Sequence, residues 1–334
     1  MDNLIKIILI AVIFFLINFS YSSSEIDYVF PNYQDVKKRI TDRNFPKFLK
    51  NEKKFFEIIG NMLNDDTSIQ KKKEAIECKI NRINSRKQNN QQKKNKILIE
   101  KLKYFSFLKK KILTHIISLI DYVYKLEVKN LEEKKNEITN EKSSIAEIQL
   151  NRGQIAPADL AFSESEVASA KKKLVFAKLA LLENKIKIIE GKKLDFIFDF
   201  TNYNNVYKVE ELKNFFLKSN TELNIKKLEA QVEEKCNKKE QDYQLEKFKI
   251  EGLNKIQNIK NKIKEYTFLE NINKHEIDAL KINFEGVNAD FEAGARTIMD
   301  VLNSMNRLQN AKLESKKIKA EILKSYYHLV FLTI

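Results

Sequence analysis

Two stretches of the sequence decide the fold: NRGQIAPADLAFSESEVASAKKKLVFAKLALLENKI, residues 151–186, and EAGARTIMDVLNSMNRLQNAKLESKKIKAEILKSYY, residues 292–327. A shift of 141 positions (294 minus 153) aligns Gly153 with Gly294, and after five further residues each glycine is followed by an aspartate. Glycine adopts the positive φ that can end a helix, and a carboxylate is favoured near the start of the next helix. Each copy therefore predicts a glycine turn followed by a helix, and the shift predicts an internal duplication.

The predicted helix of each copy has seam positions at a step of seven, which indicates a left-handed coiled coil. These positions are Leu160, Val167, Leu174, Leu181 and Ile188 in the first copy, and Val301, Leu308, Ser315, Ile322 and Leu329 in the second. A second seam has small or mixed side chains: Ser163, Ala170 and Ala177, then Ser304, Ala311 and Ile318. Small seam residues let helix backbones come close, which favours an assembly of many helices over a two-stranded zipper. An ordinary soluble helical bundle with the same seam is the alternative.

A long helix is predicted upstream of the first glycine turn. Residues 97–150 have apolar side chains at spacings of three and four, and a helix of this length would span about 80 Å. The preceding residues 81–96 (NRINSRKQNNQQKKNK) are polar apart from Ile83, so they predict a loop or a solvated helix tip. A weaker match between the stretches that begin at Asp65 and Ser219 extends the duplication. Each half is therefore expected to contain a helix, a tip, a long helix, a glycine turn and a last helix.

The composition agrees with an all-α fold. Only 6 Gly and 3 Pro occur in 334 residues, which leaves few turn signals and nearly excludes a sheet-rich fold. We expect elongated antiparallel coiled-coil hairpins in two internal repeats, residues 51–190 and 219–334. A segment at 191–218 is expected to connect them, and an N-terminal lead at 25–50 is expected to precede them.

The first residues, 1–24 (MDNLIKIILIAVIFFLINFSYSSS), have the layout of a signal peptide: Lys6, an apolar run over 7–17, and then small polar residues. The run is shorter than the ~20 residues that span a bilayer as a helix. We expect cleavage after Ser22 or Ser24 and export of the chain. An uncleaved anchor is the alternative.

Charge and rare residues indicate neither nucleic-acid binding nor catalysis. The net charge of +15 comes from lysines interleaved with Glu, Asn and Ile, which is typical of solvated helix faces. Nucleic-acid binding would be better supported by aromatic residues interleaved with arginine on one element. Cys78 and Cys236 have no CxxC spacing and no nearby histidine, so no metal site is expected; their pairing in an oxidising compartment stays open. His115, His275 and His328 are isolated on helical sequence, so we expect neither an enzyme nor a cofactor.

The duplicated segments resemble a known family. Residues 293–329 (AGARTIMDVLNSMNRLQNAKLESKKIKAEILKSYYHL) closely resemble the second repeat of the TolC family of outer-membrane efflux proteins, and residues 152–183 (RGQIAPADLAFSESEVASAKKKLVFAKLALLE) resemble its first. The resemblance covers most of the chain from about Asn51 onward, and only these two segments are specific. It implies a homotrimer whose protomers each contribute two helical hairpins to a periplasmic α-barrel joined to the outer membrane. Inner-membrane pumps and periplasmic adaptors would dock at the turn end.

The resemblance also implies roles for residues near the turns. In the family, bonds between neighbouring coiled coils close the periplasmic entrance and aspartates narrow it. Arg296 and Asp159 match positions that hold the entrance shut, and an Arg–carboxylate pair can be bidentate. Asp300 matches a position of the constriction ring, where three copies would favour cations. Phe291 stands where the family often has Tyr and Asn303 replaces a second aspartate, so a looser and less cation-selective gate is implied.

The sequence departs from the family where membrane strands are implied. A transmembrane strand needs about 9–11 alternating residues, but residues 81–96 contain one Ile and residues 235–250 (KCNKKEQDYQLEKFKI) have a charged helical pattern. The alternating segment LDFIFDF, residues 194–200, lies between the two halves. We therefore expect β-barrel strands to be reduced or absent. Two functions follow: a shortened TolC-like channel component for efflux or type I secretion, or a barrel-less periplasmic coiled-coil structural or interaction protein that no longer transports.

Overall fold

The computed structural model describes residues 33–41, 52–64, 66–86, 89–183, 208–232 and 238–334. Within these ranges every regular element is an α-helix, so the all-α prediction is confirmed for the described part of the chain. The predicted signal peptide, the alternating segment at 194–200 and Cys236 lie outside the described residues.

The helices follow the predicted duplication. They are α2 (Tyr33–Thr41), α3 (Glu52–Asn64), α4 (Thr67–Ser85), α5 (Asn90–Asn151), α6 (Pro157–Glu183), α7 (Val209–Ser219), α8 (Thr221–Val232), α9 (Lys238–Glu292) and α10 (Ile298–Thr333). Each half contains a short helix, a second helix, a long helix, a glycine turn and a last helix, which pairs α3 to α6 with α7 to α10. The short helix α7 occupies the end of the segment that the sequence predicts to be connecting.

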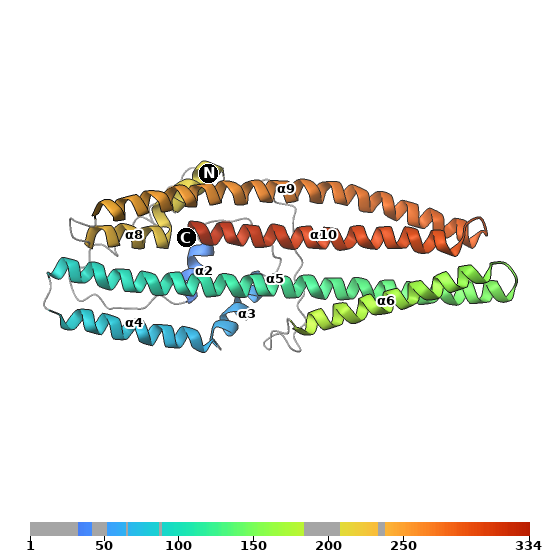
Figure 1. The fold of residues 1–334 in the computed structure, drawn as a ribbon, viewed down its shortest axis with the longest axis horizontal. Helices are drawn as coiled ribbons and strands as arrows, with labels where there is room; N and C mark the ends of the chain where they lie inside the picture. Colours follow the sequence, from blue (N-terminus) through green and yellow to red (C-terminus); the bar gives the residue numbers. More distant parts are fainter. Residues whose placement is uncertain (1–32, 42–51, 65, 87–88, 184–207, 233–237) are drawn as a thin grey trace.

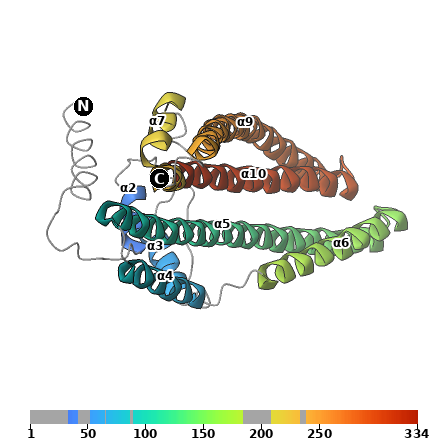
Figure 2. The ribbon, with the colours of Figure 1, turned by 60° about the vertical axis from the view of Figure 1, so that its left-hand side comes forward.

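The four longest helices form one elongated layer in the order α9, α10, α5, α6 (Figure 1). Helix α10 packs against α9 of its own hairpin and against α5 of the other hairpin. Helices α4 and α8 lie beside the first parts of α5 and α9. Figure 2 shows the α5–α6 and α9–α10 hairpins extending in the same direction, so both glycine turns lie at one end of the molecule. Helices α6 and α9 are therefore the two edges of the layer.

The main core joins the middle of the layer to the short helices. Its fully buried side chains include Phe56 of α3, Ile112 and Ile116 of α5, Phe216 of α7 and Ile256 of α9. Burial of such large apolar side chains is the main favourable contribution to folding. The short helices therefore belong to the folded unit of the long hairpins.

The predicted seams face neighbouring helices. In α6 the small residues Ser163, Ala170 and Ala177 are buried, and Ser163 Oγ lies 3.2 Å from Ser143 Oγ of α5. The larger seam residues of α6 are half-buried: Leu160, Val167, Leu174 and Leu181. In α10 both seams are buried throughout: Val301, Ser304, Leu308, Ala311, Ser315, Ile318, Ile322 and Leu329. The difference indicates that α6, at the edge of the layer, has less of its surface covered than α10.

The end of α10 is fixed to the start of α8. Asn220 Nδ2 donates to the carbonyl oxygen of Leu332 at 2.6 Å, and Thr221 Oγ1 donates to that of Ile334 at 2.9 Å. Carbonyls at a helix C-terminus have no partner within the helix, so these side chains satisfy them. These contacts join the start of α8 to the C-terminal end of α10.

Where the family resemblance implies membrane strands, the described residues are helical. Helix α4 runs to Ser85 and α5 begins at Asn90, so most of the polar tract at 81–96 belongs to these two helices, and the long helix starts before the predicted residue 97. The side chain of Asn89 caps α5 by accepting from the N–H of Gln91 at 3.0 Å. Helix α9 already begins at Lys238. Among the described helices, none combines the length and apolar character that a membrane crossing requires.

Candidate functional site

Both long helices end in the same hydrogen-bonded turn. Gly153 has φ of 69° and Gly294 has φ of 80°, the left-handed region that glycine adopts without strain. The N–H of Gly153 donates to Leu150 O at 2.8 Å, and the next N–H donates to Gln149 O at 2.9 Å. The second turn repeats these bonds at 2.9 and 2.8 Å. This pattern is the Schellman motif, and it confirms the predicted glycine turns.

The duplicated aspartates cap the helices that follow the turns. Asp300 is the third residue of α10 and forms a capping box with Thr297: Thr297 Oγ1 accepts the N–H of Asp300 at 3.2 Å, and Asp300 Oδ2 accepts the N–H of Thr297 at 3.1 Å. Hydrogen bonds from the Thr297 backbone and side chain lower the pKa of Asp300. Asp159 makes half of this arrangement, because its Oδ2 accepts the N–H of Ala156 at 3.2 Å and alanine offers no side-chain acceptor in return.

The charged side chains at the turns are on the surface. Arg296 Nε lies 3.6 Å from Asp290 Oδ2, and both side chains are more than half exposed. Among the described residues, no ion pair joins Arg296 to Asp159 within one chain. Asp159 is half-buried, and Asn303 is exposed one turn after Asp300. The predicted gate residues therefore lie at the same end of the molecule without pairing inside it.

Phe291 lies in an apolar cluster beneath the turns. It is 4% exposed and packs with residues of α5 and α10, including Ala146 and Val301. Lys142 Nζ lies 5.7 Å from the centre of its ring, within the range of a cation–π contact. A tyrosine hydroxyl in such a place would need a hydrogen-bond partner, so phenylalanine suits this environment. The cluster joins the two hairpins at the turn end.

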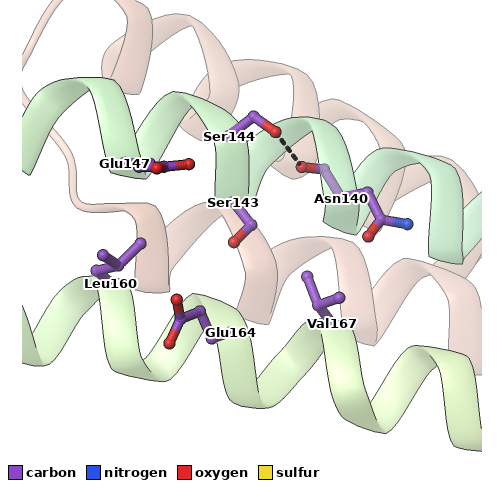
Figure 3. Close-up of a pocket in the computed structure, with 7 residues that line it drawn as sticks. All are labelled: Asn140, Ser143, Ser144, Glu147, Leu160, Glu164 and Val167. Carbon is purple, nitrogen blue, oxygen red and sulfur yellow. Dashed lines mark hydrogen bonds between the residues drawn. The ribbon is translucent and has the colours of Figure 1, made fainter.

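A polar groove runs between α5 and α6 close to the turns (Figure 3). Its volume is about 210 Å³, and its lining consists of Asn140, Ser143, Ser144, Glu147, Leu160, Glu164 and Val167. Figure 3 shows Ser144 directed back to its own helix, where its Oγ donates to Asn140 O at 3.2 Å. Small-molecule pockets usually enclose about 300–1,000 Å³ with mostly apolar walls. The groove is smaller and more polar, so it suits a surface contact better than an enclosed ligand.

A buried polar layer crosses the hairpins between this cluster and the main core, and the sequence patterns missed it. Asn306 of α10 donates from Nδ2 to Glu166 Oε2 of α6 at 2.9 Å. Lys135 and Glu132 of α5 are 3% and 7% exposed. Burial lowers the pKa of Lys135 and Lys173 adds to this effect, while Glu132 and Glu166 oppose it. The sequence does place polar residues at positions that face other helices. They indicate a polar layer only when the positions of α5, α6 and α10 relative to one another are known.

The three histidines lie on α5, α9 and α10, away from the glycine turns. His115 Nε2 lies 3.7 Å from Asp66 Oδ2, and Asp66 caps α4 by accepting the N–H of Ser68 at 2.9 Å. His275 and His328 are exposed on α9 and α10. Within the described ranges, no three His, Cys, Asp or Glu side chains converge as a metal site would require.

No protein-family model matches the sequence, and a search of curated proteins finds no relative. Solved structures match it in fold. The CmeC outer membrane channel of Campylobacter jejuni is 13% identical with a TM-score of 0.59, covering 73% of this chain and 66% of that chain. CusC, described with transmembrane channel formation, is 10% identical with a TM-score of 0.57, covering 86% and 93%. The outer-membrane channel OprN is 8% identical with a TM-score of 0.63, covering 94% and 93%.

These likenesses establish the fold. The chain has the TolC-like fold that the duplicated glycine turns predict, and it spans 66% of the length of CmeC. The similar structures are channel proteins and not enzymes.

Proposed function

We propose that three copies of the exported chain form a helical barrel in the periplasm, as the conduit of a TolC-like efflux or type I secretion channel of the outer membrane. The TolC-like fold supports this proposal. The observation that carries it is an exposed apolar stripe on each of the two edges of the helical layer.

The stripe on α6 points away from the rest of the chain. Val175, Leu179 and Leu182 are 54%, 50% and 58% exposed. Leu179 follows the buried Ala170 by nine residues, and nine steps of about 100° place it about 180° around the helix. Since Ala170 faces α5, this stripe faces outward.

The stripe on α9 likewise faces away from the buried side of its helix. Ile250, Phe268, Ile272 and Ile282 are 58%, 65%, 49% and 71% exposed. Phe268 follows Ile263, which is buried in the main core, by five residues, or about 140° around the helix. Isolated apolar side chains on a surface are common, but a stripe along each edge marks an interaction surface.

The two stripes lie at the same level. At 1.5 Å per residue, Leu179 lies about 33 Å from the start of α6 at Pro157, and Phe268 lies about 36 Å from the end of α9 at Glu292. Because both glycine turns lie at one end, α6 of one copy can pair with α9 of the next (Figure 1). A head-to-tail contact between different surfaces forms a ring when the rotation between successive copies closes, and ring closure is part of this proposal. The number of three copies comes from the resemblance to the TolC family.

In such a ring the glycine turns surround the periplasmic entrance. We expect Arg296 of one copy to exchange its contact with Asp290 for Asp159 of a neighbouring copy, which would restrain the entrance. Three copies of Asp300 would favour cations, whereas Asn303 adds no charge. An inner-membrane pump and a periplasmic adaptor would dock at this end, where the groove between α5 and α6 offers a contact surface.

A second candidate is a periplasmic coiled-coil protein that assembles in the same way but no longer transports. The observation that favours it is the helical structure of α4, α5 and α9 at the two places where the family resemblance implies membrane strands. This candidate shares the edge contacts with the first and differs from it in its relation to the outer membrane.

Density-gradient fractionation of native membranes, followed by washes with high salt and urea, separates the two candidates. An outer-membrane channel is expected to stay in the outer-membrane fraction as a wash-resistant trimer. Release of the chain as a soluble or peripheral species would contradict the channel and support the second candidate.

A further inference from the structure

The tip between α4 and α5 has an unusual charge distribution. Residues 78–99 contain seven basic residues and no Asp or Glu: Lys79, Arg82, Arg86, Lys87, Lys93, Lys94 and Lys96. Over the whole chain, by contrast, 61 basic residues are accompanied by 46 acidic ones. The interleaving that explains the charge elsewhere is therefore missing at this tip.

Several of these charges are available to a partner. Arg82, Arg86 and Lys94 are exposed, and within the described residues their charged groups form no ion pair. Other basic side chains of the tip are used in its own structure. Lys93 Nζ donates to Asn84 O at 2.7 Å, and Lys79 Nζ lies 3.6 Å from Glu100 Oε2. Lys79 and Lys93 thus help to hold the tip together, while Arg82, Arg86 and Lys94 are exposed to solvent.

The tip lies at the end of the molecule opposite the glycine turns (Figure 1). It includes the start of α5, where the helix dipole adds partial positive charge. Lys238 and Lys239 at the start of α9 are exposed at the same end, next to Glu240. Because the tip lies at one end of the long axis, its basic groups can contact a flat surface that is perpendicular to this axis.

The composition of the tip selects the partner. Residues 78–99 contain no aromatic side chain, so no platform exists on which the bases of a single-stranded nucleic acid could stack. Ile80 and Ile97 are buried in a cluster with Ile76 and Tyr104, so the tip does not offer them to hydrocarbon. Exposed basic and amide side chains without apolar anchors suit the phosphates of a membrane surface.

We propose that the α4–α5 tip docks on an anionic bilayer by binding lipid phosphates through Arg82, Arg86 and Lys94. This contact orients the long axis of the molecule perpendicular to the membrane surface, so the glycine turns lie at the end far from the membrane. It requires neither transport nor ring closure, so it holds for both candidate functions.

The test is co-sedimentation of the full chain with phosphatidylcholine vesicles that contain or lack phosphatidylglycerol. We compare the wild type with a tip variant, Arg82→Gln with Arg86→Gln and Lys94→Gln. The matched control removes two exposed arginines and one exposed lysine from the turn half of the molecule: Arg152→Gln, Arg307→Gln and Lys171→Gln. Both variants lose three charges, and far-ultraviolet circular dichroism checks that their helical content equals that of the wild type.

Wild type and control are expected to bind the anionic vesicles and to be released from them by high salt. Neither should bind vesicles of phosphatidylcholine alone. The tip variant should bind about a hundredfold more weakly. Equal losses in the tip variant and the control would overturn the proposal, because they would reflect net charge alone. Undiminished binding of the tip variant, or tip-dependent binding of duplex DNA without binding of anionic vesicles, would overturn it as well.

Discussion

Substitution of Gly252 by alanine sets two opposing effects against each other within α9. Glycine inside a helix costs about 1 kcal/mol relative to alanine, so Gly252→Ala gains that amount from helix propensity alone. A Cβ atom at this position would lie 2.0 Å from Cζ of Phe216 and 2.6 and 2.7 Å from two further ring atoms. Carbon atoms in contact are about 3.5–4.0 Å apart, so the ring has to move.

The ring has little room to move. Phe216 of α7 is 0% exposed and stacks on Phe248 at a centroid distance of 6.2 Å. Expulsion of a buried phenylalanine costs about as much as its truncation to alanine, roughly 3–5 kcal/mol. After subtraction of the gain of about 1 kcal/mol, Gly252→Ala is expected to destabilise the chain by about 2–4 kcal/mol.

A double-mutant cycle tests the cause. In a Phe216→Ala background the obstacle is gone, so Gly252→Ala should stabilise α9 by about 1 kcal/mol and the sign of its effect should reverse. The assays are denaturant unfolding at one fixed protein concentration and hydrogen exchange of the α7 amides, which should lose protection in Gly252→Ala alone. If Gly252→Ala stabilises the wild-type chain, or if its effect is the same in both backgrounds, the close packing of α7 on α9 is wrong.

Three further predictions concern the turns and the pH dependence, and thermal unfolding measures each. Thr297→Ala removes an N-cap and should cost about 1 kcal/mol, whereas Ala156→Thr completes the matching box in the first repeat and should gain a similar amount; equal midpoints would contradict the caps. Gly294→Ala should cost about 1–2 kcal/mol through its left-handed backbone alone, because nothing lies within 4 Å of the added Cβ, and Gly294→Asn should cost less. Burial lowers the pKa of His115 below its unfolded value of about 6.5, with Asp66 opposing in part, so the native state binds fewer protons and loses stability as pH falls through that value. His115→Gln should flatten this dependence, and an unchanged pH profile would exclude His115 as its source.

The features that the sequence predicts well are those encoded locally. A glycine that ends one helix and an aspartate that starts the next need only a few neighbouring residues, and their duplication doubles the signal. Helix α5 begins earlier than the predicted residue 97, at Asn90, because Gln and Lys are good helix formers and Asn89 supplies the cap. The polar tract therefore contributes to the helix and not only to the tip.

The features that sequence patterns miss depend on distant segments. Helices α3 and α7 are short, and their place in the core becomes evident only when Phe56 and Phe216 are seen buried against the long helices. The polar layer joins Glu166 to Asn306, 140 positions apart (306 minus 166), which no spacing rule along one helix detects. The proposed contact of Arg296 with Asp159 needs a neighbouring copy, so a single chain leaves it a prediction.

A ring in which α6 of each copy pairs with α9 of the next predicts a distinctive set of particle masses for variants with a substitution in either stripe. Leu179→Glu places a charge in the α6 stripe, and Phe268→Glu places one in the α9 stripe. The control is Asn258→Glu, which is exposed on α9 but about 80° around the helix from Ile250. Light scattering or native mass spectrometry gives the masses at one fixed concentration.

The wild type and Asn258→Glu are expected to have three times the mass of one chain, and each edge variant alone to be a monomer. An equimolar mixture of the two edge variants should form dimers, because one intact α9 edge meets one intact α6 edge and both outer edges are blocked. A monomeric wild type, or a mixture that contains no dimers, would contradict a ring closed by these two edges.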